Sequence, residues 1–172
     1  TRYRNGELIG TTSTPTLDIS LEVAPKYQWP VANDPSTVPV YGRFYTWYAV
    51  TDSRNVCPTG YHVPTDAEFV TLTTLLGGEP VAGGEVKELG TAHWNAPNLG
   101  ATNSSGFTAV AGGYRQMTGA FASFGISSPY WTSSQNPTPA YGWGQSLNFN
   151  LASMLRMGFD KPAGCVVRCL KD

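Results

Sequence analysis

Charged residues are scarce in this sequence. Only 13% of its 172 residues are Asp, Glu, Lys or Arg, against a typical value of roughly 25%. Eleven basic residues nearly balance twelve acidic ones, and no stretch gathers Lys or Arg into a stripe that could neutralise phosphates. A nucleic acid is therefore not an expected partner. The hydrophobic runs are only a few residues long, far below the roughly 20 that cross a bilayer, so we expect a soluble fragment that does not insert into a membrane.

Residue types that bind metals or carry catalysis are also few. The two histidines, His62 and His93, lie in unrelated segments without a second ligand at helix or finger spacing, which favours hydrogen-bonded structural roles. No Asp/Asn-rich loop closes on a Glu as a calcium loop does. The pairs Ser104-Ser105 and Ser133-Ser134 lack the glycine-flanked elbow of a serine nucleophile. We therefore expect no metal, no cofactor and no catalytic residues.

Cysteine is limited to three residues, which excludes a disulfide-dense scaffold. If the segment from Cys165 to Cys169 is a strand, alternation places both thiols on one face. At about 3.3 Å per residue they would lie roughly 13 Å apart, too far to bridge each other. Cys57 is then the one possible partner for either of them, and one thiol stays free.

The length suits one domain, residues 1–172, that can bury a core without several disulfides or a metal. Five prolines interrupt residues 1–40, which predicts an extended arm packed on the rest of the domain. Residues 41–50 are dense in aromatic and β-branched side chains. They fit either a buried strand or a short aromatic helix.

A helix is predicted after Pro64. Thr65 and Glu68 have the spacing of a capping box, apolar residues follow at helical spacing up to Leu76, and Gly77-Gly78 offers a left-handed stop. A second short helix is expected over residues 84–89. From residue 95 onward glycines separate short apolar runs, which is typical of loops and short antiparallel strands. Helices followed by a loop-rich sheet indicate an α+β fold.

Six stretches between Tyr41 and the end carry a specific family resemblance. They are Tyr41–Val50, Cys57–Glu68, His93–Asn98, Gly112–Arg115, Tyr130–Ser134 and Val167–Asp172. With them the chain closely resembles the Fibrobacter succinogenes major paralogous domain, a family of bacterial surface and viral proteins. Residues 1–6 also resemble the usual opening of this family.

The resemblance implies a C-type-lectin-like fold related to that of the formylglycine-generating enzymes. Members of the family include variable proteins that retroelements diversify near the C-terminal end, here residues 130–172. Adenine-directed mutagenesis of asparagine codons yields a restricted set of residues. The positions that fit this set are Tyr141, Gly144, Asn148, Asn150, Leu151, Ser153, Leu155 and Asp160. We expect these residues to contact a ligand and, apart from Gly144, to cluster on one exposed face. Leu147 and Phe149 should face the core, Asn148 and Asn150 should face solvent, and Trp131 and Trp143 should lie in the core or at its rim.

The resemblance leaves three functions to weigh. The first is a ligand-binding domain, resembling a paratope, for a protein or glycan of a cell surface, located on a cell surface, secreted or on a virion. The second is an oxidase similar to formylglycine-generating enzymes, which hold copper with two cysteines separated by four residues. Cys165 and Cys169 are separated by three. The third is a purely structural module of a surface protein.

The resemblance also bears on the cysteines. Cys165 stands where the family pattern usually has an aromatic core residue, so we expect it to be a free, buried thiol. Cys57 and Cys169 should then lie close together in the core, placed to form a disulfide.

Overall fold

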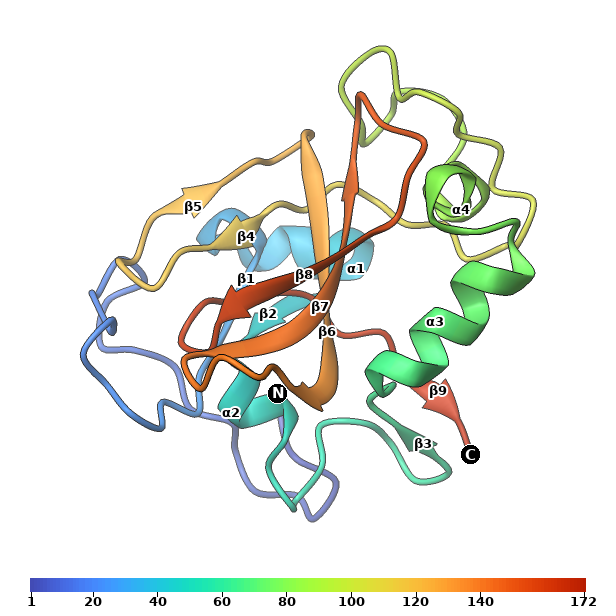
Figure 1. Cartoon of the computed structure of the whole chain (residues 1–172). Coiled ribbons are helices and arrows are strands. Elements are labelled where there is room, and N and C mark those ends of the chain that lie inside the picture. Colours follow the sequence, from blue (N-terminus) through green and yellow to red (C-terminus); the bar gives the residue numbers. More distant parts are fainter.

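Antiparallel pairing organises the chain around a three-stranded sheet. The computed structural model describes all 172 residues. Strands β6 (Ser127–Gln135), β7 (Tyr141–Asn148) and β8 (Leu155–Asp160) pair in the order β6-β7-β8, so that β7 is central and β8 forms an edge (Figure 1). One face of this sheet packs on the main core cluster through Tyr130 and Leu147. The other face carries Trp131, which is fully buried, and Phe159.

The remaining elements are short. Three two-stranded sheets are formed by β1 (Gln28–Pro30) with β2 (Arg43–Tyr45), β3 (Tyr61–His62) with β9 (Leu170–Lys171), and β4 (Tyr114–Arg115) with β5 (Phe121–Ala122). The helices are α1 (Val38–Tyr41), α2 (Trp47–Val50), α3 (Asp66–Leu75) and α4 (Glu79–Val86), with 3-10 turns at Val31–Asn33 and Pro35–Thr37. This mixture of short helices and short antiparallel sheets confirms an α+β fold.

Helix α3 begins at the predicted capping box. The Glu68 N–H donates to the Thr65 hydroxyl at 3.2 Å, and the Thr65 N–H donates to the Glu68 carboxylate at 2.7 Å. Because these bonds satisfy two N–H groups that have no partner within the helix, the chain enters the helix at this point. Phe69 on the inner face is buried in the main core cluster.

The second helix begins five residues earlier than predicted and ends three residues earlier. Residues 84–89 were expected to be helical, but α4 spans Glu79–Val86 and contains Gly83 and Gly84. Neighbouring segments require these two glycines. A Cβ on Gly83 would lie 2.1 Å from the Ser153 carbonyl oxygen, and one on Gly84 would lie 2.1 Å from that of Gly100. The glycines therefore mark close packing and not a helix boundary.

Residues 1–40 contact the rest of the chain through a buried cluster and a buried arginine. Ile19, Trp29 and Val31 of the arm form a buried cluster with Phe44. The fully buried Arg115 stacks on the Trp29 ring at 4.0 Å and donates hydrogen bonds to the carbonyls of Pro15 and Leu17. Residues 41–50 contain both predicted alternatives, because β2 is followed directly by α2.

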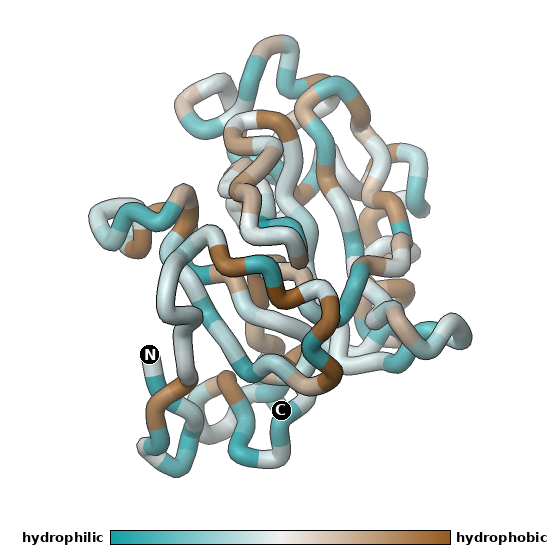
Figure 2. Tube along the Cα trace, turned by 90° about the vertical axis from the view of Figure 1, so that its left-hand side faces the viewer, coloured by the Kyte–Doolittle hydropathy of each residue, from teal (hydrophilic) through white to brown (hydrophobic).

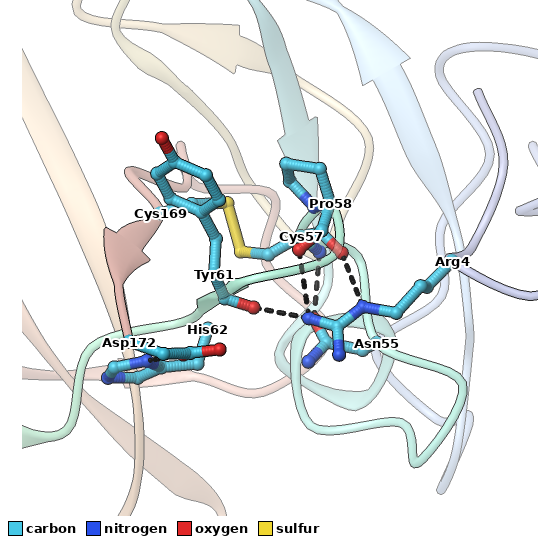
Figure 3. The surroundings of a disulfide bond; sticks show 8 residues. All are labelled: Arg4, Asn55, Cys57, Pro58, Tyr61, His62, Cys169 and Asp172. Carbon is cyan, nitrogen blue, oxygen red and sulfur yellow. Dashed lines mark hydrogen bonds and ion pairs between the residues drawn. A yellow bond between two sulfur atoms is a disulfide. The ribbon is translucent and has the colours of Figure 1, made fainter.

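A disulfide joins Cys57 to Cys169, with the two Cα atoms 5.8 Å apart, and Cys165 is free and fully buried, as predicted. Burial raises the pKa of the Cys165 thiol well above its ordinary value. Figure 3 shows Arg4 beside the bridge, where its guanidinium donates to the carbonyls of Cys57, Pro58 and Tyr61. The arm is therefore fastened at the disulfide as well as at Arg115.

The tail before β9 is not the regular strand that was assumed in weighing the cysteine pairings. Gly164, Cys165 and Val166 each form a single bridge, to Arg115, Tyr45 and Tyr130 respectively, and regular pairing begins only at Leu170. The tail crosses three different segments in turn, so no single neighbouring strand can pair with its whole length. Cys165, Val167 and Cys169 nevertheless pack in one cluster.

Hydrophobic residues occur in short stretches along the chain, separated by hydrophilic ones (Figure 2). None of the helices has both the length and the apolar character needed to cross a bilayer.

Candidate ligand-binding surface

The eight candidate contact residues lie along the β7–β8 hairpin. Tyr141 is paired with Asp160 at one end, Asn148 lies at the other end of β7, and Leu155 is paired with Ser146. The remaining loop candidates, Asn150, Leu151 and Ser153, lie between the strands. Over the seven residue steps of β7 the two ends are about 23 Å apart. The hairpin gathers the candidates into one ribbon, but alternation places Tyr141 and Asn148 on opposite faces of it, so the candidates do not share the single exposed face that was expected.

Exposure differs among these residues. Tyr141, Asn150 and Leu151 are exposed, whereas Asn148, Ser153, Leu155 and Asp160 are half-buried. Gly144 departs from the expectation because it is buried inside the sheet. A Cβ at this position would lie 2.6 Å from the Tyr130 carbonyl oxygen and 2.9 Å from the Phe159 ring. Packing therefore requires glycine at position 144, and a side chain placed there would not reach the surface.

The alternation predicted at the end of β7 is present. Leu147 is fully buried and Phe149 packs against the same core cluster, while Asn148 is half-buried and Asn150 is exposed. Trp131 lies in the core, where its Nε1–H donates to the Tyr45 carbonyl at 2.7 Å. Trp143 lies at the rim, and its ring is covered by the guanidinium of Arg156 at 3.5 Å.

A buried lysine fixes the loop between β7 and β8. Lys87 is fully buried, and its ammonium donates to the carbonyl oxygens of Leu99 at 2.9 Å, Asn148 at 3.0 Å and Leu151 at 2.8 Å. Burial lowers the pKa of Lys87 to about 8, so the side chain is mostly charged at neutral pH. Its three N–H donors are all used, and each holds a different point of the surrounding loops.

The same loop is bound on its other sides through main-chain atoms. The Gly84 N–H donates to the Ala152 carbonyl at 2.8 Å, and the Met154 N–H donates to the Glu79 carbonyl at 3.0 Å. The Leu99 N–H donates to the Phe149 carbonyl at 2.7 Å. Every one of these bonds uses the backbone of the loop and none uses a loop side chain. The loop conformation is therefore independent of which side chains occupy positions 150, 151 and 153.

A groove of about 560 Å³ lies beside the hairpin. It is bounded by the sheet face that carries Leu155, Met157 and Phe159 on one side and by the β4–β5 turn on the other. The lining residues are Tyr114, Gln116, Met117, Thr118, Ser127, Pro129, Ser146, Asn148, Leu155, Met157, Gly158, Phe159, Asp160 and Ala163. Asp160 is the one charged residue among them. The groove thus combines an apolar floor with hydroxyl and amide groups.

Sequence reasoning did not find the second wall of this groove. Gln116, Met117 and Thr118 precede Gly119, which has a positive φ and closely approaches the Thr16 carbonyl. A glycine between two short apolar runs is a signal for a hairpin turn, but it does not tell which strand the turn will face.

Both histidines form hydrogen bonds with carboxylates. His62 lies between Asp172, at 2.7 Å from Nδ1, and Glu68, at 2.9 Å from Nε2, and these two hydrogen bonds raise its pKa in that order of importance. His93 bonds Glu88 at 2.7 Å. No group of three or more His, Cys, Asp or Glu side chains is arranged to hold a metal ion.

Comparison with known proteins places these features in a family. The sequence model described as the Fibrobacter succinogenes major domain matches residues 1–171. The searches of curated proteins and of solved structures found no match.

Proposed function

The chain belongs to the Fibrobacter succinogenes major domain family, and from that membership and the geometry of the β7–β8 hairpin we propose that it is a ligand-binding domain. In this proposal the scaffold has a C-type-lectin-like fold, and retroelement mutagenesis diversifies side chains along the hairpin. The ligand is a protein or glycan of a cell surface, and the domain acts on a cell surface, in secreted form or on a virion.

The observation that carries the proposal is the way in which the 149–154 loop is held. Lys87, Gly84 and Glu79 bind its main chain, as described above, so the side chains at positions 150, 151 and 153 are free to change without loss of the loop's shape. A rigid frame with interchangeable contact residues is the arrangement that antibody-type paratopes use. Such a frame lowers the entropic cost of binding because the loop is already ordered.

The composition of the exposed positions supports contact with a macromolecule. Tyr141 and Leu151 are exposed, at 37% and 39% of their maximal exposure, so an aromatic and an aliphatic side chain of the hairpin are available for contact. Aromatic and apolar anchors supply most of the binding energy in protein interfaces, whereas short polar residues adjust the fit. Asn150 and Ser153 fit the second role.

The oxidase alternative is less well supported by the cysteines. Cys169 is joined to Cys57, so it is not free to form a thiolate pair with Cys165. Cys165 is fully buried and its pKa is raised, which opposes the thiolate form that metal binding requires. A purely structural module would share the whole scaffold and would differ only in having no ligand for the hairpin.

A library tests the proposal. Positions 141, 148, 150, 151, 153, 155 and 160 are varied together through the residues that mutated asparagine codons encode, and Gly144 is kept. We expect most variants to melt close to the parent temperature and to select different protein or glycan ligands when displayed. A matched control library at Trp131, Leu147 and Met154, which are buried, should mostly fail to fold. Broad unfolding in the first library, or ligand choice that does not depend on these positions, would contradict the proposal.

Single substitutions in any ligand complex so obtained give a second readout. Tyr141→Ala or Leu155→Ala should weaken binding more than Ser153→Ala, because the first two remove the larger contact areas.

A further inference from the structure

The outer edge of β8 has main-chain groups without partners. Along an antiparallel pair, residues alternate between those that bond the neighbouring strand and those that face away from it. The Tyr141 carbonyl accepts from Asn136 N–H and from the Gln135 side chain, both on the β6 side of β7. Its paired residue Asp160 therefore does not bond β7, and its main chain faces away from the sheet.

A second set of bonds gives the same alternation independently. The Trp131 N–H and the Pro129 carbonyl both bond Val166 and so face away from β7. Tyr130 between them must then bond Gln145 of β7, which turns the Gln145 main chain away from β8. Arg156, the β8 residue paired with Gln145, is thereby left facing outward.

The outward-facing residues are thus Arg156, Gly158 and Asp160. Arg156 and Gly158 are exposed, and their N–H and C=O groups make no main-chain bond outside the hairpin. The Asp160 carbonyl accepts from Ala163 N–H, so only its N–H is free. Such an edge is a template for one more strand.

Side chains of an added strand would meet two different surfaces. Leu155, Met157 and Phe159 point into the 560 Å³ groove, so residues of the added strand on this face would fill it with apolar side chains. Asp160 borders the end of the groove, and by alternation its side chain extends from the opposite face, beside its paired residue, the exposed Tyr141. Alternating strand residues would therefore meet an apolar groove and a carboxylate with an aromatic ring.

The carboxylate of Asp160 favours a partner segment that carries a basic residue. Asp160 takes part in none of the chain's ion pairs, and no Lys or Arg lines the groove. Of the neighbouring cations, Lys161 lies over the Trp47 ring at 4.5 Å, and Arg156 is held by bidentate bonds to Asp66 at 2.8–3.0 Å and by stacking on Trp143. A basic side chain from a partner would satisfy Asp160 and could also stack on Tyr141.

We infer that β8 binds an extended peptide segment of a partner protein as a fourth strand of the sheet. Apolar side chains at alternate positions of the segment occupy the groove, and a Lys or Arg between them lies beside Asp160. This mode of recognition gives affinity through main-chain hydrogen bonds and specificity through the alternate side chains. It rests on the proposed function and specifies the class of ligand.

Amide hydrogen exchange followed by NMR tests the edge itself. In the free protein, the amides of Met157 and Phe159, which bond β7, should exchange slowly, and those of Arg156 and Gly158 should exchange fast. The probe is the synthetic peptide Val-Thr-Val-Lys-Val-Thr-Val with blocked ends, at millimolar concentration. It should slow the Arg156 and Gly158 amides and leave the other two unchanged. A free protein in which all four amides are equally protected, or a peptide that slows neither edge amide, would overturn the inference.

Four matched peptides separate the contributions. Replacing the Lys by Glu should weaken binding by roughly tenfold, the equivalent of one lost charged contact. A scrambled peptide of the same composition should lose binding because its apolar residues no longer alternate. N-methylation of the residues whose N–H groups face β8 should also abolish binding, whereas methylation of the alternate residues should not. Equal binding by all of these peptides would overturn strand addition.

Substitutions in the protein test the same contacts from the other side of the interface. Asp160→Lys should exchange the preference, so that the Glu peptide binds better than the Lys peptide, while the same charge change at Glu22→Lys in the N-terminal arm should leave the preference as it was. Gly158→Pro removes one outward N–H and should weaken the Lys peptide by roughly tenfold. If this proline variant does not fold, the N-methylated peptides give the same information.

Sedimentation of the protein without peptide distinguishes a second copy of the chain as occupant. A monomer is expected, and a dimer that Gly158→Pro dissociates would overturn the inference in favour of self-pairing. The proposed function fails separately. A hairpin library that changes ligand choice, together with an edge that never binds peptide, would keep the proposed function and refute strand addition.

Discussion

Replacing Lys87 by Met should release the loop that carries Asn150 and Leu151. The Lys87 ammonium donates hydrogen bonds to three main-chain carbonyl oxygens at 2.8 to 3.0 Å. Methionine fills a similar volume but donates nothing, so the three acceptors lose their partner at about 2 kcal/mol each. Against this, burial lowers the lysine pKa from 10.5 to about 8, so the variant regains about 3 kcal/mol of desolvation cost. The free energy of unfolding should therefore fall by about 3 kcal/mol.

Urea denaturation at pH 7 with the disulfide intact measures this difference, and amide exchange locates it. Exchange should accelerate most in residues 149–154 and around Leu99, because those carbonyl-bearing segments lose their common anchor. Lys26→Met is the matched control, since Lys26 is half-exposed and its one ion pair is with Asp52, a carboxylate that Arg54 also pairs. A Lys87→Met protein with unchanged stability and unchanged loop exchange would refute the view that this cation organises the loop.

Three further predictions concern local features of the scaffold. The pKa of His62 is raised in the folded state, so its stabilising effect is complete below pH 6.5, the ordinary pKa, and is lost as the pH rises through the higher folded-state pKa. The difference in melting temperature between the parent and His62→Gln should shrink over that pH range. A constant difference would refute the pairing of His62 with Asp172 and Glu68. The disulfide closes a loop with a sequence separation of 112 residues, so its removal should cost about 4–5 kcal/mol, and the unreduced, denatured chain should titrate a single thiol, that of Cys165. Thr65→Ala should destabilise the protein by about 1 kcal/mol in urea melts, and Thr71→Ala, within the same helix, by much less; equal effects would mean that the cap is not a special position.

The features that the sequence predicted correctly are those with local causes. The capping box at Thr65 and Glu68 is complete within four residues, and the alternation at Leu147 and Asn148 follows from strand geometry alone. The disulfide followed from the resemblance, which set Cys165 apart as a core residue. These predictions needed no knowledge of which distant segment lies opposite.

The features that were missed depend on distant segments. Gly83 and Gly84 look like helix breakers until the carbonyls of Ser153 and Gly100 are seen against them. Lys87 resembles any helix-end lysine, because its acceptors lie 12, 61 and 64 residues away. Gly144 fits a codon pattern for surface variation, yet packing holds it inside the sheet. Tertiary contacts decide each of these positions, and a single sequence does not display them.

The disulfide also determines how the domain transmits force. If the two ends of the chain are pulled apart, tension passes along residues 1–57, crosses the two sulfur atoms and leaves through the last residues after Cys169. The segment of 112 residue steps between the cysteines carries no tension, so about 400 Å of contour length cannot be extended while the disulfide is intact. All eight candidate contact residues and Lys87 lie within that covalent ring. A tethered domain can therefore be stretched at its N-terminal arm while the hairpin bears no load.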